Sequence, residues 1–125
     1  MSEVAGRLAV VEGASYLSAY KSGRGVLILG APGTDSLDVV IIGGAVVGMN
    51  CAKISGRMGA RLMTFDCSLT RLTYLDNMFG NPVITRYSTS ETPRNSLERV
   101  VVVVSTLLTP EQALLNCFSG TCWLI

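Results

Sequence analysis

Histidine is absent from this chain of 125 residues, and charged side chains are scarce. Histidine is the commonest general acid or base near neutral pH, so the chain lacks the usual proton carrier of an active site. Charged residues make up 15% of the sequence, whereas a free-standing soluble domain carries about 25%. We therefore expect the chain to bury surface against another chain or to be part of a larger protein.

Long apolar runs and basic clusters are also missing. The longest apolar run, Val100 to Val104, is far shorter than the roughly 18 residues of a membrane helix. The ten basic residues are dispersed and the net charge is +1, which argues against nucleic acid as a partner. The opening Met1-Ser2-Glu3 leads into no signal-peptide pattern. These absences predict a cytoplasmic protein without a membrane partner.

The four cysteines form no C-x-x-C pair and have no histidine beside them to complete a zinc site. They are Cys51, Cys67, Cys117 and Cys122. We interpret them as reduced cytosolic thiols. The final Cys122-Trp123-Leu124-Ile125 matches the C-a-a-X pattern only loosely, and no polybasic segment precedes it, which disfavours prenylation.

Apolar runs alternate with helical patterns along the chain. Strands are expected at residues 39–42, 61–65, 83–87 and 100–104, and helices at 2–20, 46–58, 68–78 and 109–116. This order predicts an α/β fold, a Rossmann-type doubly wound parallel sheet with strand order 3-2-1-4, preceded by an N-terminal helix. The sheet would be incomplete, with the valine-rich edge of the fourth strand unpaired and able to drive association.

The spacing of apolar residues assigns a buried face to the first and third helices. Ser2 is the expected N-cap of the first helix, and Ser68 of the third. The residues predicted to face the core are Val4, Leu8, Val11 and Leu17 in the first helix, and Leu69, Leu72 and Leu75 in the third.

A glycine-rich turn follows the first predicted strand. The segment Gly43-Gly44-Ala45-Val46-Val47-Gly48 has the order of a G-x-G-x-x-G dinucleotide fingerprint, with Ala45 in place of the middle glycine. Gly43 would make the tight turn, and Gly48 would let helix and strand pack closely. The methyl group of Ala45 would stand where the backbone approaches a pyrophosphate. The alternative interpretation, an ordinary turn after a strand, is disfavoured by the elements on either side.

Asp66 ends the second predicted strand, 18 residues after Gly48. In a dinucleotide site, a carboxylate there accepts hydrogen bonds from the adenosine ribose and selects NAD over NADP. Asp66 could equally cap the following helix, and both roles can coexist. Arg71 lies one turn into that helix, either beside the ribose or simply in solvent.

The sequence resembles the alanine dehydrogenases over residues 1 to about 110. The opening Met1 to Val10 and the stretch Gly23-Arg24-Gly25-Val26-Leu27 resemble the segment that enters their nucleotide domain. The resemblance continues through Asp38 to Gly48 and Thr85-Arg86-Tyr87-Ser88. The opening segment separates this family from the related proton-translocating transhydrogenases.

The resemblance implies NAD as cofactor and the oxidative deamination of L-alanine to pyruvate and ammonia. It implies that Ser2 contacts the cofactor phosphates, and that Ser88 lies near the adenine. It also implies that Leu107 and Leu108 line the nicotinamide side. The loop over the pyrophosphate would comprise Gly43, Ala45, Val46, Val47 and Gly48, with Asp66 as the ribose acid and Arg71 beside it.

The chain also departs from the family pattern. Residues 111–125 do not match it, and the family's catalytic lysine and histidine have no counterpart. The sequence therefore divides into an N-terminal helix and connector (1–37), an NAD(H)-binding Rossmann domain (38–110) and a divergent tail (111–125). We expect a homo-oligomer and no catalysis by the chain alone, because the substrate domain is missing. Two alternatives stay open, a non-catalytic Rossmann interaction module and the NAD-binding subunit of a transhydrogenase.

Overall fold

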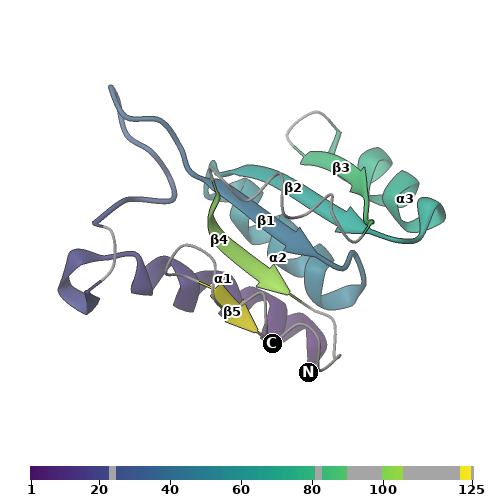
Figure 1. The fold of residues 1–125 in the computed structure, drawn as a ribbon, viewed down its shortest axis with the longest axis horizontal. Helices are drawn as coiled ribbons and strands as arrows, with labels where there is room; N and C mark the ends of the chain where they lie inside the picture. The colour runs from purple at the N-terminus through teal and green to yellow at the C-terminus, as the bar shows by residue number, and fades with distance from the viewer. Residues whose placement is uncertain (23–24, 81–82, 90–99, 106–121, 125) are drawn as a thin grey trace.

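The computed structural model describes residues 1–22, 25–80, 83–89, 100–105 and 122–124. Within them, five parallel strands form one sheet in the order β3-β2-β1-β4-β5 (Figure 1). The strands are β1 (Asp38–Ile42), β2 (Arg61–Asp66), β3 (Val83–Tyr87), β4 (Val100–Ser105) and β5 (Cys122–Leu124). The predicted order 3-2-1-4 is confirmed for the first four strands.

The prediction of an unpaired edge on the fourth strand is wrong. β5 runs parallel to β4, from the pair Val103 and Cys122 to the pair Ser105 and Leu124. β5 has only three residues, which is too short a run for a period-two pattern to reveal. The edge of β4 is therefore paired within the chain over residues 103–105.

Helices α2 (Val46–Arg57) and α3 (Leu69–Phe79) connect β1 to β2 and β2 to β3. The predicted cap of α3 is confirmed, since the Ser68 hydroxyl accepts a hydrogen bond from the N–H of Arg71 at 3.3 Å. Leu72 and Leu75 are buried as predicted, but Leu69 is exposed. Positions six residues apart on a helix differ by about 120°, so Leu69 cannot share the core-facing side with Leu75.

Helix α1 (Ser2–Tyr16) is shorter than predicted and is followed by the short 3-10 helix η1 (Ala19–Lys21). Its N-cap is Met1, so the assignment of Ser2 as the cap is wrong. The predicted buried face is also wrong for three residues: Val4, Leu8 and Val11 are more than half exposed. Leu17, beyond the end of the helix, is fully buried as predicted.

The face of α1 that packs inward consists of small residues, because α1 approaches α2 closely. The buried residues of α1 are Gly6, Ala9, Val10 and Gly13. A Cβ on Gly6 would stand 2.4 Å from the carbonyl oxygen of Val47 in α2. The thiol of Cys51 donates to the carbonyl oxygen of Gly6 at 3.0 Å. Burial raises the pKa of that thiol to about 12, so it stays protonated at neutral pH.

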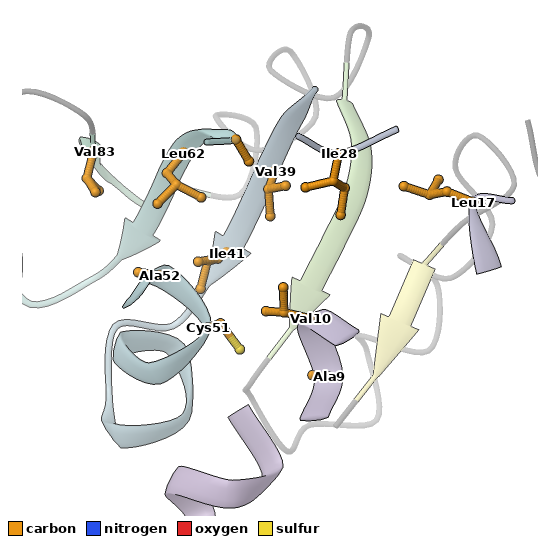
Figure 2. Packing of buried hydrophobic residues seen from close by; sticks show 11 residues of the cluster. Ala9, Val10, Leu17, Ile28, Val39, Ile41, Cys51, Ala52, Leu62 and Val83 are labelled. Carbon is orange, nitrogen blue, oxygen red and sulfur yellow. The ribbon is translucent and has the colours of Figure 1, made fainter. Parts of the chain in front are cut away.

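One hydrophobic cluster joins α1 and α2 to the sheet (Figure 2). From the sheet it includes Val39 and Ile41 of β1 and Leu62 of β2. Val40 and Ile42, which alternate with them along β1, are also buried. The apolar run of β1, which shows no alternation with polar residues, is therefore covered on both faces, as is typical of a parallel sheet.

Two hydroxyl groups, those of Ser55 and Thr64, are buried without a hydrogen-bond partner among the described residues. A buried unsatisfied hydroxyl is unfavourable, so Thr64→Val is expected to raise the free energy of unfolding by about 1 kcal/mol. Urea denaturation followed by circular dichroism measures the change. In the control Thr73→Val, the lost hydroxyl is exposed and bonded to the carbonyl oxygen of Leu69, so no gain is expected. A lower urea midpoint for Thr64→Val would contradict the prediction.

Candidate functional site

The turn after β1 depends on two glycines. Gly43 has a φ of 99°, in the left-handed region that side chains disfavour. Its N–H donates to the carbonyl oxygen of Phe65 at 2.7 Å. A Cβ on Gly48, in the first turn of α2, would stand 1.8 Å from the carbonyl oxygen of Gly43. Gly48 therefore lets helix and strand meet as predicted.

Ala45 fits this turn without backbone strain. It is the N-cap of α2, with φ −70° and ψ −163°. The amides of the first turn of α2 follow directly, and such amides favour an anion. The substituted glycine of the fingerprint thus costs nothing in backbone conformation. Its effect would come from the methyl group alone.

The carboxylate of Asp66 lies against the glycine turn. Its Oδ2 accepts a hydrogen bond from the N–H of Gly44 at 2.7 Å, and its Oδ1 accepts one from the N–H of Ser68 at 2.8 Å. The carboxyl ends of β1 and β2, which are parallel neighbours, thus bring the acid and the glycines together. Asp66 also supports the start of α3, so both roles considered for it are compatible with the structure.

Arg71 binds the carbonyl group of Gly44, whose N–H is bound by Asp66. Its Nε donates to the carbonyl oxygen of Gly44 at 2.5 Å, and its guanidinium lies 4.9 Å from the centre of the Tyr74 ring. A Cβ on Gly44 would approach Leu75 Cδ1 to 2.7 Å and Asp66 Oδ2 to 3.1 Å. The backbone of Gly44 is therefore fixed at both its N–H and its carbonyl.

The side chains of Asp66 and Arg71 line an open cavity of about 400 Å³. Its lining residues are Ala45, Val46, Asp66, Ser68 and Arg71. The cavity combines a carboxylate, a guanidinium, a hydroxyl and the start of a helix, which suits a ligand carrying both hydroxyl groups and an anion. From its place in the sequence, Ser68 is predicted only as a helix cap. Its position two residues after Asp66 was the signal that it also borders the cavity.

The remaining predicted site residues lie outside this lining. Val47 meets α1 through its carbonyl oxygen, near Gly6. Ser88 lies next to Asp66, because its N–H donates to the Asp66 carbonyl oxygen at 2.8 Å. Ser2 is the first residue of α1, and Figure 1 shows α1 beginning at the side of the sheet where the strand arrows end. Leu107 and Leu108 lie outside the described residues.

The polar groups that line the cavity are suited to binding a ligand. Within the described residues, no cluster of three or more histidine, cysteine, aspartate or glutamate side chains could hold a metal ion. The sequence also contains no histidine.

Comparison with known proteins identifies the family to which this chain is similar. The model of the family "Alanine dehydrogenase/PNT, C-terminal domain" matches residues 9–114. An alanine dehydrogenase of Methanococcus maripaludis is 43% identical over 110 residues, and one of Mycobacterium tuberculosis is 41% identical. Both alignments cover 88% of this chain and 30% of the relative.

Solved structures support the same grouping. An L-alanine dehydrogenase superposes with a TM-score of 0.84 at 40% identity, covering 88% of this chain and 30% of the other. A transhydrogenase from Sinorhizobium meliloti shares the fold, with a TM-score of 0.69 at 13% identity. The chain thus spans about 30% of the length of its curated relatives. With its glycine turn, its acid and a family match over most of its length, this chain belongs to the alanine dehydrogenase/PNT C-terminal domain family.

Proposed function

We propose that this chain binds NAD(H) and is the cofactor-binding part of an alanine dehydrogenase. The observation that carries the proposal is the 2.7 Å hydrogen bond between the Asp66 carboxylate and the N–H of Gly44. It places an acid suited to a ribose diol directly against a turn suited to a diphosphate. Gly48 lies too close to the carbonyl oxygen of Gly43 to carry a side chain, which is the close helix–strand packing that a dinucleotide-binding turn requires.

Different residues in and around the cavity would bind different parts of the cofactor. The backbone from Gly43 to Val47, at the start of α2, would hold the pyrophosphate. Asp66 would hold the adenosine ribose, with Arg71 beside it. From the family resemblance, Ser2 would contact the phosphates, Ser88 the adenine, and Leu107 and Leu108 the nicotinamide side.

When bound in a complete alanine dehydrogenase, NAD would accept the hydride from the α-carbon of L-alanine as pyruvate and ammonia form. This chain would supply the cofactor cradle, and another chain or a longer protein would supply the groups that handle the substrate's carbonyl and protons. A homo-oligomer and a cytoplasmic location belong to the same proposal. Gel filtration tests the first of these directly.

The test is a fluorescence titration of the purified chain with NADH and with NADPH. We expect micromolar binding of NADH, and weaker binding of NADPH because the Asp66 carboxylate repels a 2′-phosphate. The chain alone should form no NADH from L-alanine and NAD. Absence of NADH binding by folded protein would overturn the proposal in favour of a non-catalytic interaction module. Alanine-dependent turnover would overturn the view that the chain is only a cradle.

The transhydrogenase alternative would require a membrane partner. In the part of the chain that the structure describes, no helix has the length and apolar character to span a bilayer. The relatives at about 40% identity are alanine dehydrogenases, whereas the transhydrogenase structure shares 13%. The alanine dehydrogenase assignment is the better supported of the two.

Ala45 gives a second prediction about this site. Its methyl group lines the cavity at the fingerprint position where glycine lets the backbone approach a pyrophosphate. Ala45→Gly is expected to tighten NADH binding about fivefold, or about 1 kcal/mol. The control Ala31→Gly introduces a glycine at an exposed position outside the cavity and should leave the Kd unchanged. Equal or weaker NADH binding by Ala45→Gly would remove the idea that the methyl group crowds the cofactor.

A further inference from the structure

A second cavity lies at the opposite end of the sheet from the glycine turn. Its volume is about 350 Å³, within the range of small-molecule sites. It is formed where α2 and α3 end and β2 and β3 begin, so it lies at the amino ends of the parallel strands. Its lining residues are Ala52, Lys53, Gly56, Arg57, Leu62, Met78, Phe79 and Val83. None of them borders the cavity beside Asp66.

The floor of this second cavity is apolar and well packed. Ala52, Leu62 and Val83 are each at most 4% exposed, and Figure 2 shows them together on the side of the cluster nearest β3. Gly56 leaves the space above this floor open, since a Cβ there would already approach Leu62 Cδ1 to 3.3 Å. A ligand here would therefore meet hydrocarbon on one side.

Among the described residues that line the cavity, Lys53 and Arg57 are the charged ones. They are four residues apart on α2, so their side chains lie on the same face of the helix. Neither side chain makes a hydrogen bond or ion pair with any described residue, and neither α2 nor the rest of the described lining contains an acid. Two neighbouring cations of like charge are unfavourable by themselves, and an anion between them would relieve that repulsion.

The geometry points to a second binding site, which takes a small amphipathic monoanion, a carboxylate on an apolar body. The apolar body would lie on Ala52, Leu62 and Val83, and the carboxylate would bind Lys53 and Arg57 at the rim. A guanidinium and an ammonium give a carboxylate charge-assisted hydrogen bonds, which are the strong ones. The site is separate from the proposed cofactor site and does not depend on it.

Octanoate is the probe, with uncharged octanamide as its matched neutral analogue. Amide NMR spectra of the full chain are recorded during titration with each compound. We expect octanoate to shift amides at the ends of α2 and α3 and at the start of β2, while the amides of Gly44 and Asp66 stay in place. Octanamide should bind about tenfold more weakly, since it lacks the charge that Lys53 and Arg57 recognise.

Three single substitutions, each of which removes one positive charge, test the role of the cations. Lys53→Gln and Arg57→Gln should each weaken octanoate binding about fivefold to tenfold. The control Arg86→Gln, an exposed arginine outside the cavity, should leave it unchanged. Gly56→Leu, which places a side chain in the cavity, should abolish binding, and the charge variants keep the test valid if this variant does not fold.

Four outcomes would overturn the inference. They are no amide shift up to the solubility limit of octanoate, shifts that map outside the cavity, equal affinity for octanamide, and equal weakening by Arg86→Gln. Because NADH plays no part in this titration, its result is independent of whether the chain binds the cofactor.

Discussion

The substitution Gly48→Ala is expected to lower the free energy of unfolding by about 3 kcal/mol or more and to abolish NADH binding. The added Cβ would stand 1.8 Å from the carbonyl oxygen of Gly43 and 3.2 Å from Ile41 Cγ2. The first of these contacts is with backbone, so no side-chain rotation can relieve it. Either α2 must move away from β1, which breaks the turn that begins the cofactor site, or the chain must unfold. Urea denaturation and an NADH titration measure the two effects.

Gly56→Ala is the matched control, because Gly56 lies in the same helix and a Cβ there meets only the side chain of Leu62, at 3.3 Å. Alanine favours a helix over glycine by up to about 1 kcal/mol, which offsets that contact. We expect a change in stability within about 1 kcal/mol and unaltered NADH affinity. If Gly48→Ala unfolds at the same urea concentration as the wild type, the close packing of α2 on β1 is wrong.

Replacing Asp66 by asparagine should weaken NADH binding about tenfold to a hundredfold, because hydrogen bonds to a charged group contribute about 1.5–3 kcal/mol. The substitution removes the charge that the proposed ribose diol requires. It also places an amide nitrogen, which cannot accept, at one of the two oxygens now bonded to the N–H groups of Gly44 and Ser68. The loss of affinity for NADPH should be smaller, since the repulsion of its 2′-phosphate disappears with the charge.

Asp38→Asn supplies the control for the loss of one carboxylate. Asp38 begins β1 at the opposite end from the glycine turn and pairs with Arg61, with Oδ1 and Nε 2.6 Å apart. Its substitution should leave the Kd for NADH unchanged. Circular dichroism identifies the fraction of each variant that is folded before binding is measured. An unaltered Kd for Asp66→Asn would mean that this carboxylate only supports the start of α3.

The features of this site that depend on neighbouring residues could be predicted from the sequence. The cap at Ser68, the turn at Gly43 and the place of Asp66 at the end of β2 each follow from neighbouring residue types and were confirmed. The hydrogen bond from Arg71 to the carbonyl oxygen of Gly44 could not be predicted. It joins residues 27 positions apart and depends on how α3 packs beside the turn.

Helix α1 shows why the burial predictions failed where they did. Apolar periodicity favoured Val4, Leu8 and Val11 as the inward side, yet these are exposed and Gly6 is buried. The contact between α1 and α2 is close enough that only small side chains fit, and hydrophobicity counts glycine as neutral. The short strand β5 was not predicted from the sequence for a different reason. Its pairing with β4 depends on the available edge of the sheet rather than on its own three residues.

The close contact between Gly6 and the carbonyl oxygen of Val47 affects how far the chain can be shortened from its N-terminal side. The first turn of α2 carries the amides proposed to hold the cofactor, and its outer side is covered by α1 rather than by solvent. Trimming the gene to start at Asp38 would uncover Cys51 and Val39, which pack with Ala9 and Val10 in one cluster. The smallest segment that could be transferred to another protein therefore includes α1. A segment that carries only the glycine motif would lack the contact between α1 and the first turn of α2.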